Sequence, residues 1–140
     1  MPTTDTTTGG RSTSSDPRTV TPLVRAFQVL SALAVLNVLY QFVTAGQLFP
    51  NGGPGEAHAA GAIVLHVLSS LAAISAVLLW RQQRLGVRAM VLAVVVFAYS
   101  FLQAYWGGYD SLWIHIPGAM LLTVGVVWVF FASLRPGVRA

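Results

Sequence analysis

Apolar residues run almost without interruption through four stretches of the chain, at about residues 23–48, 57–80, 85–106 and 111–134. Each stretch is close to the roughly 20 residues that an α-helix needs to cross the hydrocarbon core of a bilayer. Because lipid does not tolerate backbone groups without hydrogen-bond partners, each stretch is predicted to be an α-helix. Only short connections separate the stretches, so each helix is expected to run antiparallel to the one before it. The pattern therefore predicts an all-α fold, an up-down four-helix bundle integral to a membrane.

Composition agrees with this fold class. Hydrophobic residues make up 55% of the chain, charged residues only 9%, and the mean hydropathy is +0.69. A water-soluble domain does not have such a composition. Cysteine is absent, which excludes disulfides, thiolate metal sites and covalent haem attachment. There is no Ser-His-Asp set, H-E-x-x-H motif or phosphate-binding glycine loop, so no catalytic constellation is found and we do not expect an enzyme by itself.

The basic residues predict the orientation in the membrane. All eight lie in the N-terminal tail, the middle connection or the C-terminus, or within about one turn of the adjoining span ends, and these segments share one side of the predicted bundle. They are Arg11, Arg18, Arg25, Arg81, Arg84, Arg88, Arg135 and Arg139. The positive-inside rule makes that side cytoplasmic, so both termini are predicted to be cytoplasmic. We expect a multi-pass protein of the cell's inner (plasma) membrane, with the lipid bilayer and not nucleic acid as its partner.

Two regions are expected along the chain. Residues 1–20 are rich in Thr, Ser, Gly and Asp and have almost no apolar residue to bury. They are predicted to form a disordered cytoplasmic tail. Residues 21–136 are predicted to form the bundle.

Ionisable side chains inside the predicted spans are candidates for function, because they cost a few kcal/mol in hydrocarbon. All three histidines lie in the second and fourth spans, which run in the same direction. Counted from the outer ends of these helices, His58 and His115 differ in depth by roughly 4–5 Å. His66 lies roughly 12 Å deeper than His58.

Two parallel helices that each offer a histidine at similar depth provide the arrangement that ligates a b-type haem iron from both faces. Small residues at helical spacing flank both histidines and leave room for a macrocycle. They are Gly55, Gly61, Ala62, Ser111, Gly118 and Ala119. His58 and His115 are therefore candidate ligands of a haem iron, and His66 is a further candidate for cofactor binding.

Other interpretations of the histidines stay open. His58 is equally well explained as an interfacial side chain that reaches water. His66 is interpreted as a packing group that hydrogen-bonds across a helix interface, or as part of a second, deeper site. If one ligand had to be chosen, it would be His115.

The first and third spans carry uncharged polar pairs at four-residue spacing, Asn37 with Gln41 and Tyr99 with Gln103. Such residues usually hydrogen-bond from helix to helix, which is the interpretation that we favour. They would also suit a haem propionate, a quinone carbonyl or the far nitrogen of a ligating histidine.

Four segments carry a resemblance to known proteins: "LYQFVTAGQLF", "EAHAAGAIVLH", "FLQAYW" and "WIHIPGAMLL". Over about residues 25–134 the chain resembles a family of small bacterial four-helix membrane proteins without an assigned function. More distantly, it is similar to one four-helix half of haem A synthase, which has an acidic residue shortly before a histidine in its second helix and another histidine in its fourth. This resemblance implies haem ligation by His58 and His115, with Glu56 as the nearby acid.

The chain departs from the synthase pattern in three respects. Ala59 stands where the synthase commonly has a basic residue, the acid has a different spacing, and the synthase fuses two bundles. The resemblance therefore supports haem binding rather than haem A synthesis.

Two functional hypotheses follow. The first is a small membrane protein that binds haem b through histidines of helices two and four and acts in electron transfer, with a membrane redox partner or a quinone. The alternative is a cofactor-free accessory or structural membrane subunit whose histidines are packing or interfacial groups. In either case Gly118 and Gly125, seven residues apart, leave room for a contact with a second copy in a homodimer.

Overall fold

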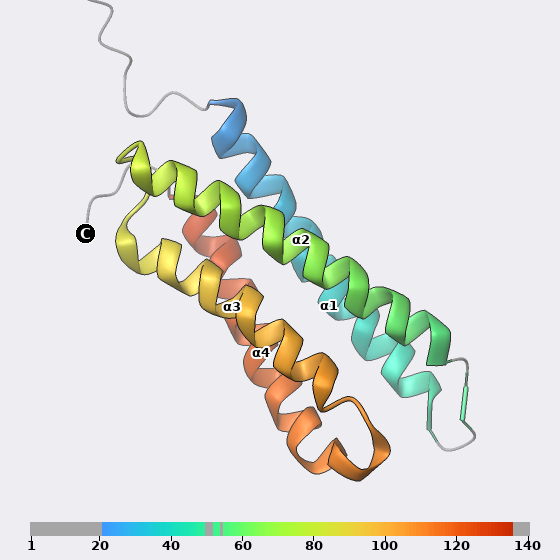
Figure 1. The fold of residues 1–140 in the computed structure, drawn as a ribbon. Helices are drawn as coiled ribbons and strands as arrows, with labels where there is room; N and C mark the ends of the chain where they lie inside the picture. The colour runs from blue at the N-terminus through green and yellow to red at the C-terminus, as the bar shows by residue number, and fades with distance from the viewer. Residues whose placement is uncertain (1–20, 50–51, 54, 136–140) are drawn as a thin grey trace, which may run out of the picture.

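The described part of the chain is all-helical. The computed structural model describes residues 21–49, 52–53 and 55–135, and within these it contains no strand. The helices are α1 (Pro22–Gln47), α2 (Gly55–Arg81), α3 (Val87–Tyr105) and α4 (Leu112–Ser133), with a short 3₁₀ turn, η1 (Tyr109–Ser111), before α4 (Figure 1). The prediction of four helices is confirmed, and their ends lie within two residues of the predicted ones. The predicted tail at residues 1–20 lies outside the described residues.

Each of the four helices is long and apolar enough to cross a membrane. Each helix also exposes large apolar side chains on its outer surface. Examples, one from each helix, are Leu36, Ile63, Val95 and Leu121. Water does not tolerate so much contiguous apolar surface on a stable monomer, whereas lipid does. The outer surface of the bundle is thus that of a multi-pass membrane protein.

The first helix begins at a strong start signal. Thr21 caps it, because its Oγ1 accepts a hydrogen bond from the backbone N–H of Val24 at 3.4 Å. Pro22 follows in the first turn, where a missing N–H costs nothing. In α4, by contrast, Pro117 lies inside the helix, one turn from its start, and removes the N–H that would otherwise bond to the preceding turn.

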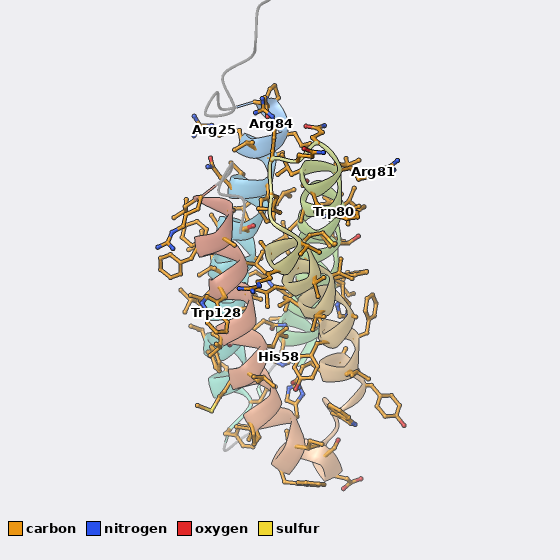
Figure 2. The ribbon with its side chains drawn as sticks, turned by 90° about the vertical axis from the view of Figure 1, so that its left-hand side faces the viewer. Arg25, His58, Trp80, Arg81, Arg84 and Trp128 are labelled. Atoms are coloured by element: carbon orange, nitrogen blue, oxygen red, sulfur yellow. The ribbon has the colours of Figure 1, made fainter. Side chains whose placement is uncertain are left out.

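The helices pack as two hairpins, α1 with α2 and α3 with α4 (Figure 1). The hairpins contact each other through α2 with α3 and through α1 with α4, while the backbones of the diagonal partners α2 and α4 lie apart. We call the end with the α1–α2 and α3–α4 connections the loop end. We call the opposite end, where α1 begins, α4 ends and α2 joins α3, the terminal end. Figure 2 shows Arg25, Arg81 and Arg84 at the terminal end and His58 in the other half of the bundle.

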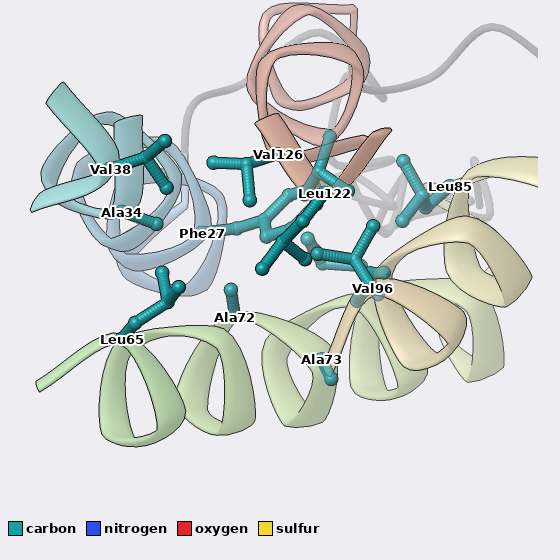
Figure 3. Packing of buried hydrophobic residues seen from close by; sticks show 14 of the residues in the cluster. Phe27, Ala34, Val38, Leu65, Ala72, Ala73, Leu85, Val96, Leu122 and Val126 are labelled. Atoms are coloured by element: carbon teal, nitrogen blue, oxygen red, sulfur yellow. The ribbon is translucent and has the colours of Figure 1, made fainter. Parts of the chain in front are cut away.

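The apolar core fills the middle of the bundle and its terminal end. Small and branched side chains interlock there, with Phe27 in the centre (Figure 3). Phe27 and Leu79 are 1% and 0% exposed. The void left among these side chains is about 10 Å³, the space of one water molecule at most. Buried serines do not disturb this core, because Ser31 and Ser69 each donate to a carbonyl of the preceding turn.

Candidate functional site

A cavity of about 650 Å³ opens at the loop end, and all three histidines line it. Most of its other lining residues are small or apolar, and they come from all four helices and both connections. They include Ala45, Gly53, Ala59, Ala62, Ala104 and Gly107. Figure 1 shows why space is left here, since the two hairpins diverge toward the loop end. The sequence placed His58 and His115 near each other in depth, and the structure adds His66 to the same cavity.

The pair formed by His58 and His115 is the centre of the site. Their ring centroids are 6.4 Å apart and their planes are inclined by 75°. One ring comes from α2 and the other from α4, the diagonal helices whose backbones lie apart. The two imidazoles therefore meet edge to face between these helices, and no hydrogen bond joins the two rings among the described residues. His115 also lines a second cavity, of about 300 Å³, on the side of α1.

The hydrogen bond of His115 fixes which of its nitrogens carries the proton. Its Nδ1 lies 2.9 Å from the backbone carbonyl oxygen of Gln103 on α3. A carbonyl oxygen only accepts, so Nδ1 carries the proton and donates. The other nitrogen of the neutral ring, Nε2, then keeps its lone pair.

His58 is held in the same way from α1. Its Nδ1 lies 3.1 Å from the hydroxyl oxygen of Thr44. That hydroxyl has a single proton, which it gives to a carbonyl of its own helix, with Gln41 O at 3.1 Å and Tyr40 O at 3.2 Å. The Thr44 oxygen is thus an acceptor toward His58, whose Nδ1 donates and whose Nε2 keeps a lone pair.

His66 follows the same rule with α3. Its Nδ1 lies 2.9 Å from the hydroxyl oxygen of Ser100, and that hydroxyl donates to the carbonyl of Phe97 at 2.7 Å. Phe101 stacks on the imidazole, with ring centroids 4.3 Å apart and planes inclined by 11°. His66 is therefore fixed in both plane and tautomer.

The three histidines share one chemical state. Each donates through Nδ1 to an oxygen on a neighbouring helix, at 2.9–3.1 Å. Histidines that bind metals almost always use their second N–H in this way, because the acceptor fixes the ring and raises its basicity. Within the described residues no three His, Asp or Glu side chains gather as ligands of a bare metal ion.

The uncharged pairs of α1 and α3 have separate roles. Asn37 donates from its amide nitrogen to the backbone carbonyl of Gly61 on α2 at 2.9 Å, which is the helix-to-helix bond that we favoured. Gln103 donates to the hydroxyl of Tyr99 at 3.1 Å within α3. It is the backbone of Gln103, not its side chain, that bonds to the far nitrogen of a histidine. Its buried Oε1 has no partner among the described residues.

The glycines of α4 face this polar layer. A side-chain carbon on Gly118 would collide with the Gln103 amide and lie 2.7 Å from the Tyr99 hydroxyl, while one on Gly125 would lie 2.7 Å from Val96. Both glycines thus serve the packing of α4 on α3 within one chain. A homodimer contact through them stays a prediction.

The acidic residue of the site is exposed. Glu56 lies in the first turn of α2, two residues before His58, and is not among the residues that line the cavity. A carboxylate is favourable at this end of a helix, because it faces the unpaired backbone N–H groups. The position accounts for Glu56 without a bond to either histidine.

No family model, curated protein or solved structure matches this chain. The site therefore has to be interpreted from its own geometry.

Two residues of the site were not predicted from the sequence, Thr44 and Ser100. Thr44 had a usable signal, because it stands three residues before the end of α1 and His58 stands three residues after the start of α2. In a helical hairpin these positions lie at equal depth. Ser100 had no such signal. The sequence does not show which residues of α3 face α2, so the contact between Ser100 and His66 could not be expected.

Proposed function

We propose that the chain is a small cytochrome-like membrane protein that binds haem b between His58 and His115. The observation that carries the proposal is the pair of imidazoles 6.4 Å apart, each fixed through Nδ1 and each left with a lone pair on Nε2. This is the state in which imidazole binds an iron.

The residues present fit such a group. A bond between a metal and an imidazole nitrogen is roughly 2 Å long, so the 6.4 Å between the ring centroids would leave room for one iron held by His58 and His115. The cavity of about 650 Å³ lies within the range of pockets that hold cofactors, about 300–1,000 Å³. Its small lining residues leave the space that a flat macrocycle needs.

Each residue of the site has a role in this proposal. His58 and His115 would hold the iron, and Thr44 and the Gln103 carbonyl orient the two rings. The apolar lining would limit the access of water to a bound haem, which tunes its reduction potential. When bound, the haem would supply one-electron oxidation and reduction.

The proposal includes the placement in the membrane. The bundle would be up-down in the plasma membrane, with both termini on the cytoplasmic side, because arginines gather at the terminal end. The haem would then lie near the outer surface. Electron exchange with a membrane redox partner on that side follows from this position.

The test is the absorption spectrum of protein purified from haem-replete cells. We expect a Soret band and a sharp α-band on reduction, both lost in His115→Ala. Val67→Ala is the matched control, because Val67 is 53% exposed on the lipid-facing side of α2. A folded but colourless wild-type protein would overturn the proposal.

A second candidate function is a cofactor-free accessory or structural subunit. It is favoured by the fact that each histidine already links two helices through Nδ1. Under it, the three histidines contribute only interhelical hydrogen bonds, at roughly 0.6 kcal/mol each. Replacement of all three would then lower stability modestly and leave the recovery of copurifying membrane proteins unchanged.

A further inference from the structure

His66 lies in the same cavity as the histidine pair but has no part in the proposed ligation of iron. Its ring stacks on Phe101 at 4.3 Å and donates from Nδ1 to Ser100 at 2.9 Å. These two contacts hold an imidazole in one plane and one tautomer inside a membrane-crossing segment. Packing alone requires neither, since a leucine would fill the same space without a polar atom in lipid.

The tautomer of His66 decides what kind of group it can bind. Because the Ser100 hydroxyl donates to Phe97, it can only accept from His66 Nδ1. Nε2 of the neutral ring is therefore an acceptor. A ligand must bring an O–H or N–H to it, so a carboxylate, a phosphate or a ketone is not a suitable partner.

The residues around His66 indicate how polar the rest of the ligand is and what shape it has. Ala59, Ala62 and Ile63 line the cavity beside it, and all are apolar. Ile63 is 64% exposed on the surface of α2 and Phe101 is 50% exposed on the surface of α3, so the wall of the site reaches the lipid. A suitable ligand is apolar and enters from the bilayer. A flat ring matches the small residues and the aromatic stack.

We propose that His66 binds the hydroxyl of a lipid-soluble quinol. The quinol O–H donates to Nε2, its flat ring lies beside Ile63 where the wall of the cavity reaches the lipid, and its apolar tail extends into the bilayer. The binding does not depend on the haem. Its consequence rests on the proposed function, because a quinol in this cavity would lie beside the histidine pair, where an electron donor to the haem is needed.

The reduced and the oxidised form of the ligand should bind to His66 with different affinities. A quinone has carbonyl oxygens and no proton to give, so it cannot bond to Nε2 in this tautomer. The site therefore prefers the quinol. In Ser100→Ala the acceptor of Nδ1 is removed and the proton is free to move to Nε2, which reduces this preference.

The experiment is a titration of the purified full-length protein with decylubiquinol and, separately, with menadiol, under anaerobic conditions. We expect at least one of them to bind saturably, at one molecule per chain, and about tenfold more tightly than its oxidised form. His66→Ala should lose about tenfold in quinol affinity and lose the preference for the reduced form. Val67→Ala, one residue away on the lipid side, should behave as wild type.

Several results would overturn the quinol site. The first is that neither quinol binds saturably, and the second is that the quinol and the quinone bind with equal affinity. The third is that His66→Ala binds the quinol as tightly as wild type does. If His66→Ala does not fold, Ser100→Ala gives the same test, since the proposal requires a smaller preference for the reduced form there.

Haem binding and quinol binding can be measured separately in the same variants. His66→Ala should keep the Soret band, and His58→Ala should keep the binding of quinol. Quinol binding by a colourless protein would support this inference and overturn the haem proposal.

Discussion

The two ends of the bundle are built on opposite principles. From the middle of the bundle to its terminal end, apolar side chains fill the interior around a void of about 10 Å³, whereas the loop end holds a cavity of about 650 Å³. Buried serines of the terminal part bond to their own helix, while the histidines of the loop end bond to neighbouring helices. The difference suggests a division of labour in which packing holds one end together and polar bonds shape the other.

This division has a physical reason. In lipid there is no hydrophobic drive between helices, so close packing of small residues is the main source of stability. Around a cavity the helices lose part of that close packing. The diverging helices therefore need other interactions to hold them together. Hydrogen bonds through histidine supply such links and orient a chemical group at the same time.

The largest effect is expected from removing the central side chain of the terminal end. Phe27→Ala should lower the free energy of unfolding by about 2 kcal/mol, because the ring is 1% exposed and its loss leaves a cavity. The haem content of the folded protein should not change. The measurement is unfolding in detergent, with Phe131→Ala as control, since Phe131 is 53% exposed. Loss of haem in a folded Phe27→Ala protein would contradict the view that packing at the terminal end and the site at the loop end are independent.

Next comes the contact between α3 and α4 at the loop end. Gly118→Ala should lower the free energy of unfolding by about 1–2 kcal/mol, because the added carbon meets the Gln103 amide and the Tyr99 hydroxyl. Gly46→Ala is the control, since nothing lies within 4 Å of its added carbon. Thermal unfolding of the two variants in the same detergent checks this. Equal stability of both would show that the close approach is not needed.

A more selective effect is expected from the acceptor of His58. Thr44→Val keeps the shape of the side chain but removes the hydroxyl that accepts from Nδ1, so haem affinity should fall about tenfold. Haem transfer to apomyoglobin measures it. Thr123→Val is the control, because Thr123 Oγ1 donates at 2.7 Å to the carbonyl of Ala119 on its own helix. A Thr44→Val protein that holds haem as tightly as wild type would contradict the assigned role.

The smallest effect is expected from the interhelical bond of Asn37. Asn37→Leu removes its bond to the Gly61 carbonyl and should cost about 0.6 kcal/mol of unfolding free energy. The absorption spectrum should stay the same. A change in the spectrum would mean that Asn37 belongs to the haem site as well as to the helix interface.

The fold could be predicted from the sequence because lipid makes strong and simple demands on a chain. Apolar length alone located the helices to within two residues, and the positions of the arginines separated the two ends. The closeness of His58 and His115 also followed from a count of residues along parallel helices. These are one-dimensional properties, so a sequence contains them.

The acceptors of the histidines could not be predicted in the same way. Thr44, Ser100 and the Gln103 carbonyl depend on how each helix is rotated about its axis, which is set by packing in three dimensions. Gly118 was expected to leave room for a second copy, yet it faces α3 of its own chain. A glycine in the sequence shows that space is needed but not which neighbour needs it.

The central proposal is that His58 and His115 together would hold one haem iron. It is tested most directly by electron paramagnetic resonance of the ferric protein. We expect a low-spin signal of two imidazole ligands in the wild type, a high-spin signal in His58→Ala, and a return to low spin when imidazole is added to that variant. A low-spin, two-imidazole signal that persists in His58→Ala without added imidazole would contradict the claim.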